Sequence, residues 1–322
     1  NKTNSGAGIY YRDGSTAKVE ISGGVIRDNT PLVTTVKALK QNAGIYINGQ
    51  NFNLKGGGST ISDRIYLAST SYPVILGGSI YQRNRMYTID CADSFTKGSI
   101  VVKPDNDVIL DATGYLRYFN TQKAGYVLEK QAPNLVLKQC IYIDSEHGSD
   151  SNDGGNPDKA VAGMTKAKSI GGAGDYIIYT SGPVYVDKEE AWDLPETAWM
   201  SRYTGFEITD ADKEWPAYTG NMILARDGAN LKLGSITIYG RREIDNVIEG
   251  DSILKVEAGA VVSMSDNTVL RLNNLPSGGK GGAVYIDQGE LAVNGGTIRD
   301  VSGYRGSAVY QNGTMSLANT SS

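Results

Sequence analysis

The chain has 322 residues, of which 40 are glycine, with a formal net charge of −4 and a pI near 5.2. An acidic chain without a basic cluster does not fit a protein that binds nucleic acid or an anionic membrane surface. No run of about 18 apolar residues occurs, so the sequence offers no helical segment for insertion into a membrane.

Similar tracts occur at both ends of the chain. GAGIYYRDG begins at Gly6, and NAGIYING begins at Asn42. The pattern returns as GGAVYIDQG from Gly281 and as GSAVYQNG from Gly306. Self-similar tracts of this kind predict a repeat architecture.

The tract that follows Gly281 contains three short segments with strand character. Residues 283–286 are β-branched and aromatic, which favours a strand, and residues 287–289 predict a tight corner because Asp and Gly tolerate turn conformations. Residues 290–294 alternate apolar and polar positions, as expected of a second strand. Two glycines precede a third strand at residues 297–299, which Asp300 closes.

The spacing of the tracts predicts how they stack. Tyr285 and Tyr310 are about 25 residues apart, a length that suits one coil of a solenoid. Three short strands and three corners in each coil predict an all-β, right-handed parallel β-helix. We therefore expect Val284 and Tyr285 to pair in parallel with Val309 and Tyr310.

The middle of the chain departs from this repeat, which becomes unrecognisable after about Asp63 and returns near Leu231. Residues 126–130 and 134–138 predict an antiparallel hairpin through a Gln-Ala-Pro turn. Such a hairpin would cover the last coil of a first module and block end-to-end pairing.

A second module is predicted to begin directly after this hairpin. Residues 157–169 predict a short helix, because Pro157 and Asp158 are favourable in a first helical turn. This helix would cover the first coil of the second module. The predicted domains are therefore residues 1–138 and residues 139–322.

Two groups of residues resemble a known family. Residues 150–154 and 157–160, DSNDG and PDKA, resemble the opening of right-handed parallel β-helix modules of the pectate-lyase-like fold in large surface proteins of Gram-positive bacteria. GGAVYI and NGGTIRD resemble the coil repeat of these modules. The resemblance implies an adhesin-like module, extracellular and either cell-wall-anchored or secreted. Its expected partner is a host protein, such as a mucin or an immunoglobulin, or a glycan.

Both termini fall within repeats, since Asn1 begins inside one and Ser322 ends inside another. We therefore expect the chain to be a monomeric fragment of a longer protein. A pure spacer that extends a distal binding domain is a further hypothesis for such a fragment.

A carbohydrate-active enzyme is the main alternative, because the same fold includes polysaccharide lyases and hydrolases. Glycoside hydrolysis needs two carboxylates roughly 5 to 10 Å apart. The aligned tracts instead place Asp287 opposite Asn312, and the recurring Arg27–Asp28 and Arg299–Asp300 pairs suit corners. We therefore predict no catalytic residues and a protein that is not an enzyme.

The sequence also predicts no metal site and no cofactor. His147 is the single histidine, and the stretch Asp150–Gly154 fails the EF-hand pattern because its fifth position is glycine and its twelfth is Val161. Cys91 and Cys140 lack the spacing of a metal site and are expected to be buried free thiols, with one disulfide as the alternative.

An acidic, aromatic-rich segment at residues 187–220 is the candidate partner-binding region. Exposed aromatic side chains among polar groups suit the stacking of sugars or contact with a protein. The alternative is that these large residues face the core of the wider early coils. The candidate residues are Trp192, Trp199, Tyr203, Trp215 and Tyr218.

Overall fold

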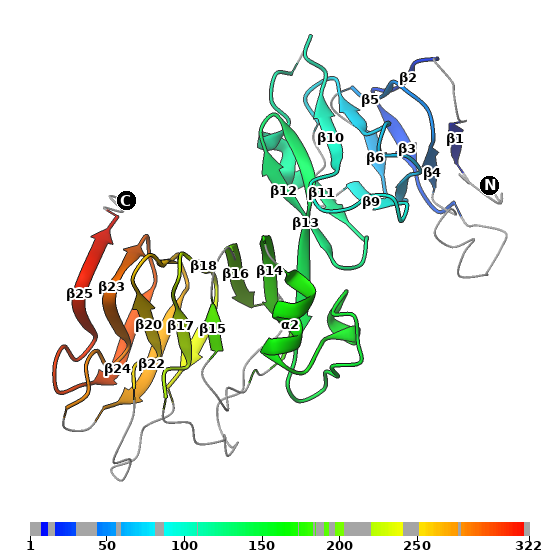
Figure 1. Cartoon of the computed structure of the whole chain (residues 1–322). Helices are drawn as coiled ribbons and strands as arrows, with labels where there is room; N and C mark the ends of the chain where they lie inside the picture. Colours follow the sequence, from blue (N-terminus) through cyan, green and yellow to red (C-terminus); the bar gives the residue numbers. More distant parts are fainter. Residues whose placement is uncertain are drawn as a thin grey trace. The chain divides into compact units, whose positions relative to one another are not determined.

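The computed structural model (Figure 1) describes residues 8–11, 17–29, 44–55, 59–80, 87–107, 109–172, 174–182, 184, 190–192, 197–202, 220–240, 251–275 and 278–318. These residues form a mostly β structure with parallel sheets, which confirms the predicted all-β class. The chain divides into two compact units, Asn1–Gln139 and Cys140–Ser322. The predicted boundary after residue 138 lies beside this division.

The described residues of the first unit form three rows of parallel strands. The first row consists of β1 (Ile9–Tyr11), β4 (Ile45–Ile47), β7 (Ile65–Leu67), β9 (Tyr87–Cys91) and β11 (Phe119–Thr121). The second row consists of β2 (Val19–Ile21), β5 (Phe52–Leu54), β8 (Val74–Leu76) and β10 (Ile100–Pro104). The third row consists of β3 (Gly24–Ile26) and β6 (Ser59–Ile61).

The core of the first unit consists of side chains that lie in register on neighbouring parallel strands. Side chains alternate between the two faces of a strand, so residues in register on parallel strands form columns on one face. One inward column consists of Ile9, Ile45, Ile65 and Ile89. Phe52 and Tyr87 are completely buried in the same core. The neighbouring outward column carries tyrosines, described below.

An antiparallel hairpin follows these rows, as predicted. Its strands are β12 (Tyr126–Gln131) and β13 (Asn134–Ile143), which pair in antiparallel register from Tyr126 and Gln139 to Gln131 and Asn134. Lys138 on β13 donates to Glu129 on β12 over 2.7 Å. The 3₁₀ helix η1 (Thr113–Tyr118) precedes the hairpin, and β13 also pairs antiparallel with β10.

The second unit begins with residues Cys140 to Ile143 of β13, which pair in parallel with β14 (Asp175–Thr180). Two helical pieces lie between these strands, η2 (Pro157–Lys159) and α2 (Met164–Gly171). Met164 and Ala167 on α2 are buried in the core of this unit. The helix therefore covers core residues, as the sequence led us to expect.

The prediction of one continuous helix from 157 to 169 was wrong. Val161 forms a parallel bridge with Ile143, and its backbone N–H donates to the Tyr142 carbonyl over 2.9 Å. This pairing holds Val161 in an extended conformation, which interrupts the helix. The Asn156 side chain accepts from the Lys159 backbone N–H and so caps η2.

The described residues of the second unit also form three rows of parallel strands. One row begins at β14 and continues through β16 (Thr197–Arg202), β18 (Asn230–Leu233), β21 (Val261–Met264) and the second half of β23 (Val284–Val293). Another consists of β15 (Glu190–Trp192), β17 (Ile223–Ala225), β20 (Leu254–Glu257) and the first half of β23. β25 (Val309–Leu317) pairs with both halves of β23. The third row consists of β19 (Thr237–Tyr239), β22 (Val269–Asn274) and β24 (Thr297–Ser302).

The last two repeats pair in the predicted register. Val284 pairs with Val309 and Tyr285 with Tyr310, which confirms the sequence alignment. The predicted corner at 287–289 was wrong in one respect, because β23 continues through it as a single bent strand. Gln288 takes a φ of 66°, and this one left-handed residue turns the strand without ending its pairing.

Candidate functional site

The structure places one of the predicted aromatic residues in the core. Trp192 is the last residue of β15 and is 0% exposed, so its ring fills the core of the second unit instead of a binding surface. The Lys168 ammonium lies 4.8 Å from the centre of this ring. Trp199 lies on β16 in register with Ile177 and Lys232. Tyr203, Trp215 and Tyr218 lie outside the described residues.

A different group of aromatic and charged residues lies together on the strands β20, β23 and β25 and on the segment just before β23. We call it the tyrosine–lysine cluster, and its members are Lys255, Glu257, Lys280, Tyr285, Asp287 and Tyr310. Strand register explains why they meet, since Lys255, Tyr285 and Tyr310 occupy one column. Glu257 and Asp287 form the next column on the same face, two residues further along each strand.

The two tyrosines of the cluster contact each other edge to face. Their ring centres are 5.5 Å apart and their planes meet at 65°. The Lys280 ammonium lies 5.1 Å from the ring centre of Tyr285 and 5.2 Å from that of Tyr310. The Lys255 ammonium lies 5.5 Å from the Tyr285 ring centre. Cations over aromatic faces at these distances are attracted by the negative charge of the π system.

The two carboxylates of the cluster share one counter-ion. Lys255 Nζ lies 2.7 Å from Glu257 Oε1 and 3.6 Å from Asp287 Oδ2. Asp287 also accepts a hydrogen bond of 3.3 Å from the Asn312 amide. The sequence alignment had placed no acid beside Asp287 in a neighbouring repeat, and this was wrong, because Glu257 pairs with it from β20.

The charge of Lys255 follows from this arrangement. Partial burial disfavours its ammonium form, but the hydrogen bond that Lys255 donates to Glu257 and the charges of Glu257 and Asp287 outweigh burial and raise the pKa of Lys255. Lys255 is therefore a fixed cation at neutral pH. An amine that is to act as a general base needs a lowered pKa, so Lys255 does not suit that role.

A tyrosine column also lies on the first unit, but its geometry differs. Tyr10, Tyr46 and Tyr66 stack with ring centres 5.1 and 5.7 Å apart and with planes inclined by only 22° and 15°. Burial, together with the charge of Asp90, raises the pKa of Tyr66 to about 12. Rings stacked in this way cover one another's faces, which suits a structural column better than a ligand platform.

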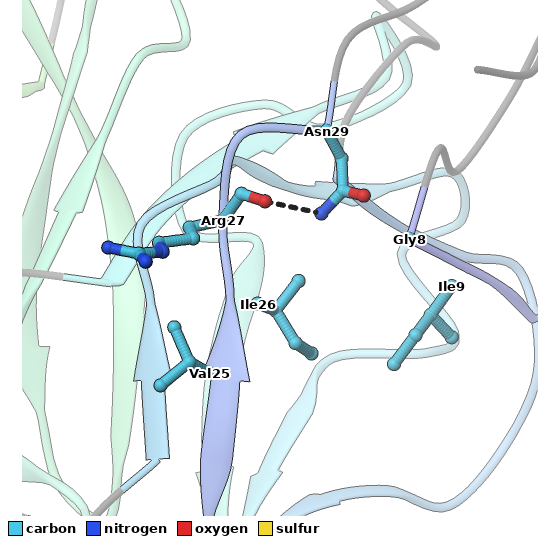
Figure 2. Close-up of a pocket in the computed structure, with 6 residues that line it drawn as sticks. All are labelled: Gly8, Ile9, Val25, Ile26, Arg27 and Asn29. Carbon is cyan, nitrogen blue, oxygen red and sulfur yellow. Dashed lines mark hydrogen bonds between the residues drawn. The ribbon is translucent and has the colours of Figure 1, made fainter. Parts of the chain in front are cut away.

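A surface hollow of about 450 Å³ lies at the first repeat of this unit (Figure 2). Its apolar side chains come from Ile9, Val25 and Ile26, and the Arg27 guanidinium extends away from Ile9. The Asn29 amide donates to the Arg27 carbonyl over 3.1 Å. The described residues of this lining offer one charged side chain, Arg27, and no acid–base pair.

The recurring Arg-Asp pairs differ in their place on the strands: Arg27–Asp28 follows β3, whereas β24 continues through Arg299–Asp300 to Ser302, so the prediction that Asp300 closes the third strand was wrong. Asp28 and Asp300 have φ values of 58° and 54°, and Asp227 adds a third left-handed example at 53°. Asp tolerates this conformation better than most residues. The ion pair between Arg299 and Asp300 is about half exposed, so it adds little to stability.

In the stretch Asp150–Gly154, which was compared with a calcium-binding loop, the Asp150 carboxylate binds backbone N–H groups. Asp150 Oδ1 accepts from the backbone N–H groups of Ala162 and Gly163 over 3.0 and 2.9 Å. His147 lies on the same loop with its side chain 79% exposed, 3.2 Å from Asp144. Across the described part of the chain, no group of three or more His, Cys, Asp or Glu side chains is arranged to hold a metal ion.

Comparisons with protein-family models, with curated proteins and with solved structures found no match for this chain. Among the described residues, no helix has the length and apolar character needed to span a membrane.

The two cysteines are buried free thiols, as predicted. Cys91 lies at the end of β9 and Cys140 lies on β13. Burial raises the pKa of each thiol to about 12. Since the thiolate is the nucleophilic form, neither cysteine is activated for catalysis.

We expect the folded protein to lose stability as the pH rises from about 9 to 12. The pKa of each thiol is raised from 9.0 to about 12, so in this range the unfolded chain releases protons that the folded chain retains. The stabilisation is complete below about pH 9 and is lost as the pH approaches 12. Urea unfolding at a series of pH values measures the effect. A Cys91→Ala, Cys140→Ala variant should lose less stability over this range, and an equal loss would contradict the assignment.

Proposed function

We propose that the chain is a non-enzymatic binding module of a bacterial cell surface. In this proposal each unit is a right-handed parallel β-helix, with the β12–β13 hairpin closing the first module and α2 beginning the second. The in-register parallel rows of both units support this architecture. Right-handed winding follows from the general preference of parallel crossover connections.

The tyrosine–lysine cluster is the observation that carries the binding function. Aromatic, cationic and amide groups are aligned on adjacent strands, where backbone pairing fixes their positions. Groups held in this way lose little conformational freedom on binding, which favours affinity. The cluster thus combines an aromatic surface with hydrogen-bonding and charged groups, as ligand recognition requires.

The partner class and the location come from the resemblance of residues 150–154 and 157–160 to adhesin-like modules. We propose a cell-wall-anchored or secreted protein that binds a host protein, such as a mucin or an immunoglobulin, or a glycan. The chain works as a monomeric part of a longer protein in this proposal.

A carbohydrate-active enzyme is the second candidate, because Glu257 and Asp287 lie in register on adjacent strands. Both carboxylates are counter-ions of Lys255, and Lys255 itself has a raised pKa. A hydrolase needs one free acid and one free base at this place, so the arrangement favours binding over catalysis.

Binding to immobilised host proteins and glycans tests the proposal. We expect reproducible binding by the intact chain and a loss of at least tenfold in affinity for Tyr310→Ala, which removes the outer ring of the cluster. Absence of binding across the whole panel would favour the spacer hypothesis instead. Release of reducing or unsaturated sugar ends from a polysaccharide panel would identify an enzyme, and Glu257→Gln should then abolish that release.

A further inference from the structure

A second basic residue, Arg305, pairs in register with Lys280, whose ammonium lies beside the tyrosines of the cluster. Lys280 and Arg305 form a parallel bridge, and the Gly281 backbone N–H donates to the Arg305 carbonyl over 2.9 Å. Residues in register on parallel segments direct their side chains to the same face. Lys280 is partly exposed and Arg305 is exposed, so both reach solvent.

These cations lack acidic partners within the described part of the chain. The carboxylates of the cluster, Glu257 and Asp287, pair with Lys255. The Lys280 ammonium donates a long hydrogen bond, 3.5 Å, to the Tyr285 hydroxyl. Like charges in register repel each other, and an anion placed between them would relieve that repulsion.

We propose that Lys280, Arg305 and the two tyrosines form a binding site for an acidic saccharide, a pyranose that carries a carboxylate or a sulfate. The sugar ring packs against the Tyr285–Tyr310 pair, and its anionic group binds Lys280 and Arg305. This inference rests on the proposed binding function and specifies its ligand class.

The geometry of the aromatic pair supports this ligand. An edge-to-face pair at 65° leaves ring surface that the partner ring does not cover, whereas the stack of Tyr10, Tyr46 and Tyr66 covers its own faces. Lys280 Nζ lies close to both rings of the pair, so a sugar stacked there would place its substituents near a cation. The guanidinium of Arg305 offers paired donors that match a carboxylate or a sulfate.

The electrostatics favour a short acidic sugar over a polyanion. Among the described residues of the site, Lys280 and Arg305 are the cations without an acidic partner, since Lys255 pairs with Glu257 and Asp287, and the chain as a whole carries a net charge of −4. Nucleic acids require an extended basic surface, because their binding depends on neutralising many phosphates. A single anionic group on a sugar needs no more than the pair present here.

Isothermal titration of the intact chain with defined saccharides tests the site. The acidic probes are 3′-sialyllactose, trigalacturonic acid and a chondroitin-4-sulfate tetrasaccharide, and the neutral probes are lactose and maltotriose. We expect at least one acidic probe to bind tenfold or more tightly than the neutral probes, with affinity that falls as salt rises. Comparison of the sialyl, uronate and sulfate probes identifies the anionic group.

Three variants locate the binding. Lys280→Gln combined with Arg305→Gln should remove the preference for acidic probes, and Tyr310→Ala should weaken binding of every sugar at least tenfold. Lys232→Gln is the matched control, because Lys232 is an exposed lysine on β18 outside the cluster, and its binding should equal that of the parent chain. Unchanged thermal unfolding of each variant shows that the fold is retained.

The outcomes separate this inference from the proposed function. Equal affinity for acidic and neutral sugars, or stronger binding of a sulfated tyrosine peptide, overturns the saccharide site and leaves the binding module in place. Failure to bind any saccharide and any immobilised host protein overturns both. An acidic preference that survives loss of Lys280 and Arg305 places the site elsewhere and also overturns the inference.

Discussion

Replacing Trp192 by alanine should lower the stability of the second unit by about 3 to 5 kcal/mol, the range measured for loss of a large buried aromatic side chain. The ring is 0% exposed and packs in the core that also contains Tyr176 and Ile178. Its removal leaves a cavity that the surrounding strands cannot fill, because paired backbones hold them in register. Scanning calorimetry or urea unfolding followed by circular dichroism measures the loss.

A Trp192→Phe variant provides the matched control. The indole N–H has no hydrogen-bond partner among the described residues, so phenylalanine removes volume but no such bond. We expect a smaller loss, about 1 to 2 kcal/mol. If Trp192→Ala leaves the unfolding transition unchanged but abolishes ligand binding, Trp192 is a surface residue and the core assignment is wrong.

The sequence indicated pairing best where tracts repeat at constant spacing. Tyr285 and Tyr310 pair across 25 residues, and the flanking Val284 and Val309 pair with the same offset. The similar tracts GGAVY and GSAVY, which begin at Gly281 and Gly306, make that offset visible. The antiparallel hairpin was equally predictable, since both of its strands are apolar and a short turn containing Pro133 separates them.

The repeat at Tyr66 was not recognised in the sequence, because the connections between repeats vary in length. Tyr10 pairs with Tyr46, 36 residues further on, whereas Tyr46 pairs with Tyr66 after only 20. The cost of closing a loop rises only slowly with its length, so corner loops can change size while the strands keep their register. The apparent interruption between Asp63 and Leu231 arose for this reason, because parallel rows continue from β7 and resume at β14.

The candidate site was missed for the same reason. Glu257 lies 30 residues before Asp287, an offset that differs from the 25 residues between Asp287 and Asn312. Alignment on the last repeat alone therefore paired Asp287 only with an amide. The sequence did contain one usable signal, since Lys280 and Arg305 precede Tyr285 and Tyr310 by the same interval.

Some glycines of the chain occupy positions that only glycine fits, because φ is positive or a Cβ would clash, whereas other glycines could be replaced. Gly281 has a φ of +65°, and Gly306 occupies the equivalent position of the next repeat with a φ of +67°. Gly23 has no such constraint, and nothing lies within 4 Å of the place that a Cβ would take. Composition alone cannot distinguish these positions, although the structure separates them clearly.

Gly281→Ala should therefore destabilise the second unit by about 2 to 4 kcal/mol, since it adds backbone strain and a steric clash. A Cβ at Gly281 would lie 2.0 Å from the Val284 carbonyl oxygen, which is fixed by strand pairing and cannot move aside.

Gly278→Ala separates backbone strain from the steric clash, because Gly278 has a φ of +103° but nothing within 4 Å of a Cβ. This variant should cost about 1 kcal/mol. Gly23→Ala should be neutral or slightly stabilising, because alanine restricts the unfolded chain. Urea unfolding of the three variants gives the order, and equal losses for Gly281→Ala and Gly278→Ala would show that the Val284 backbone gives way.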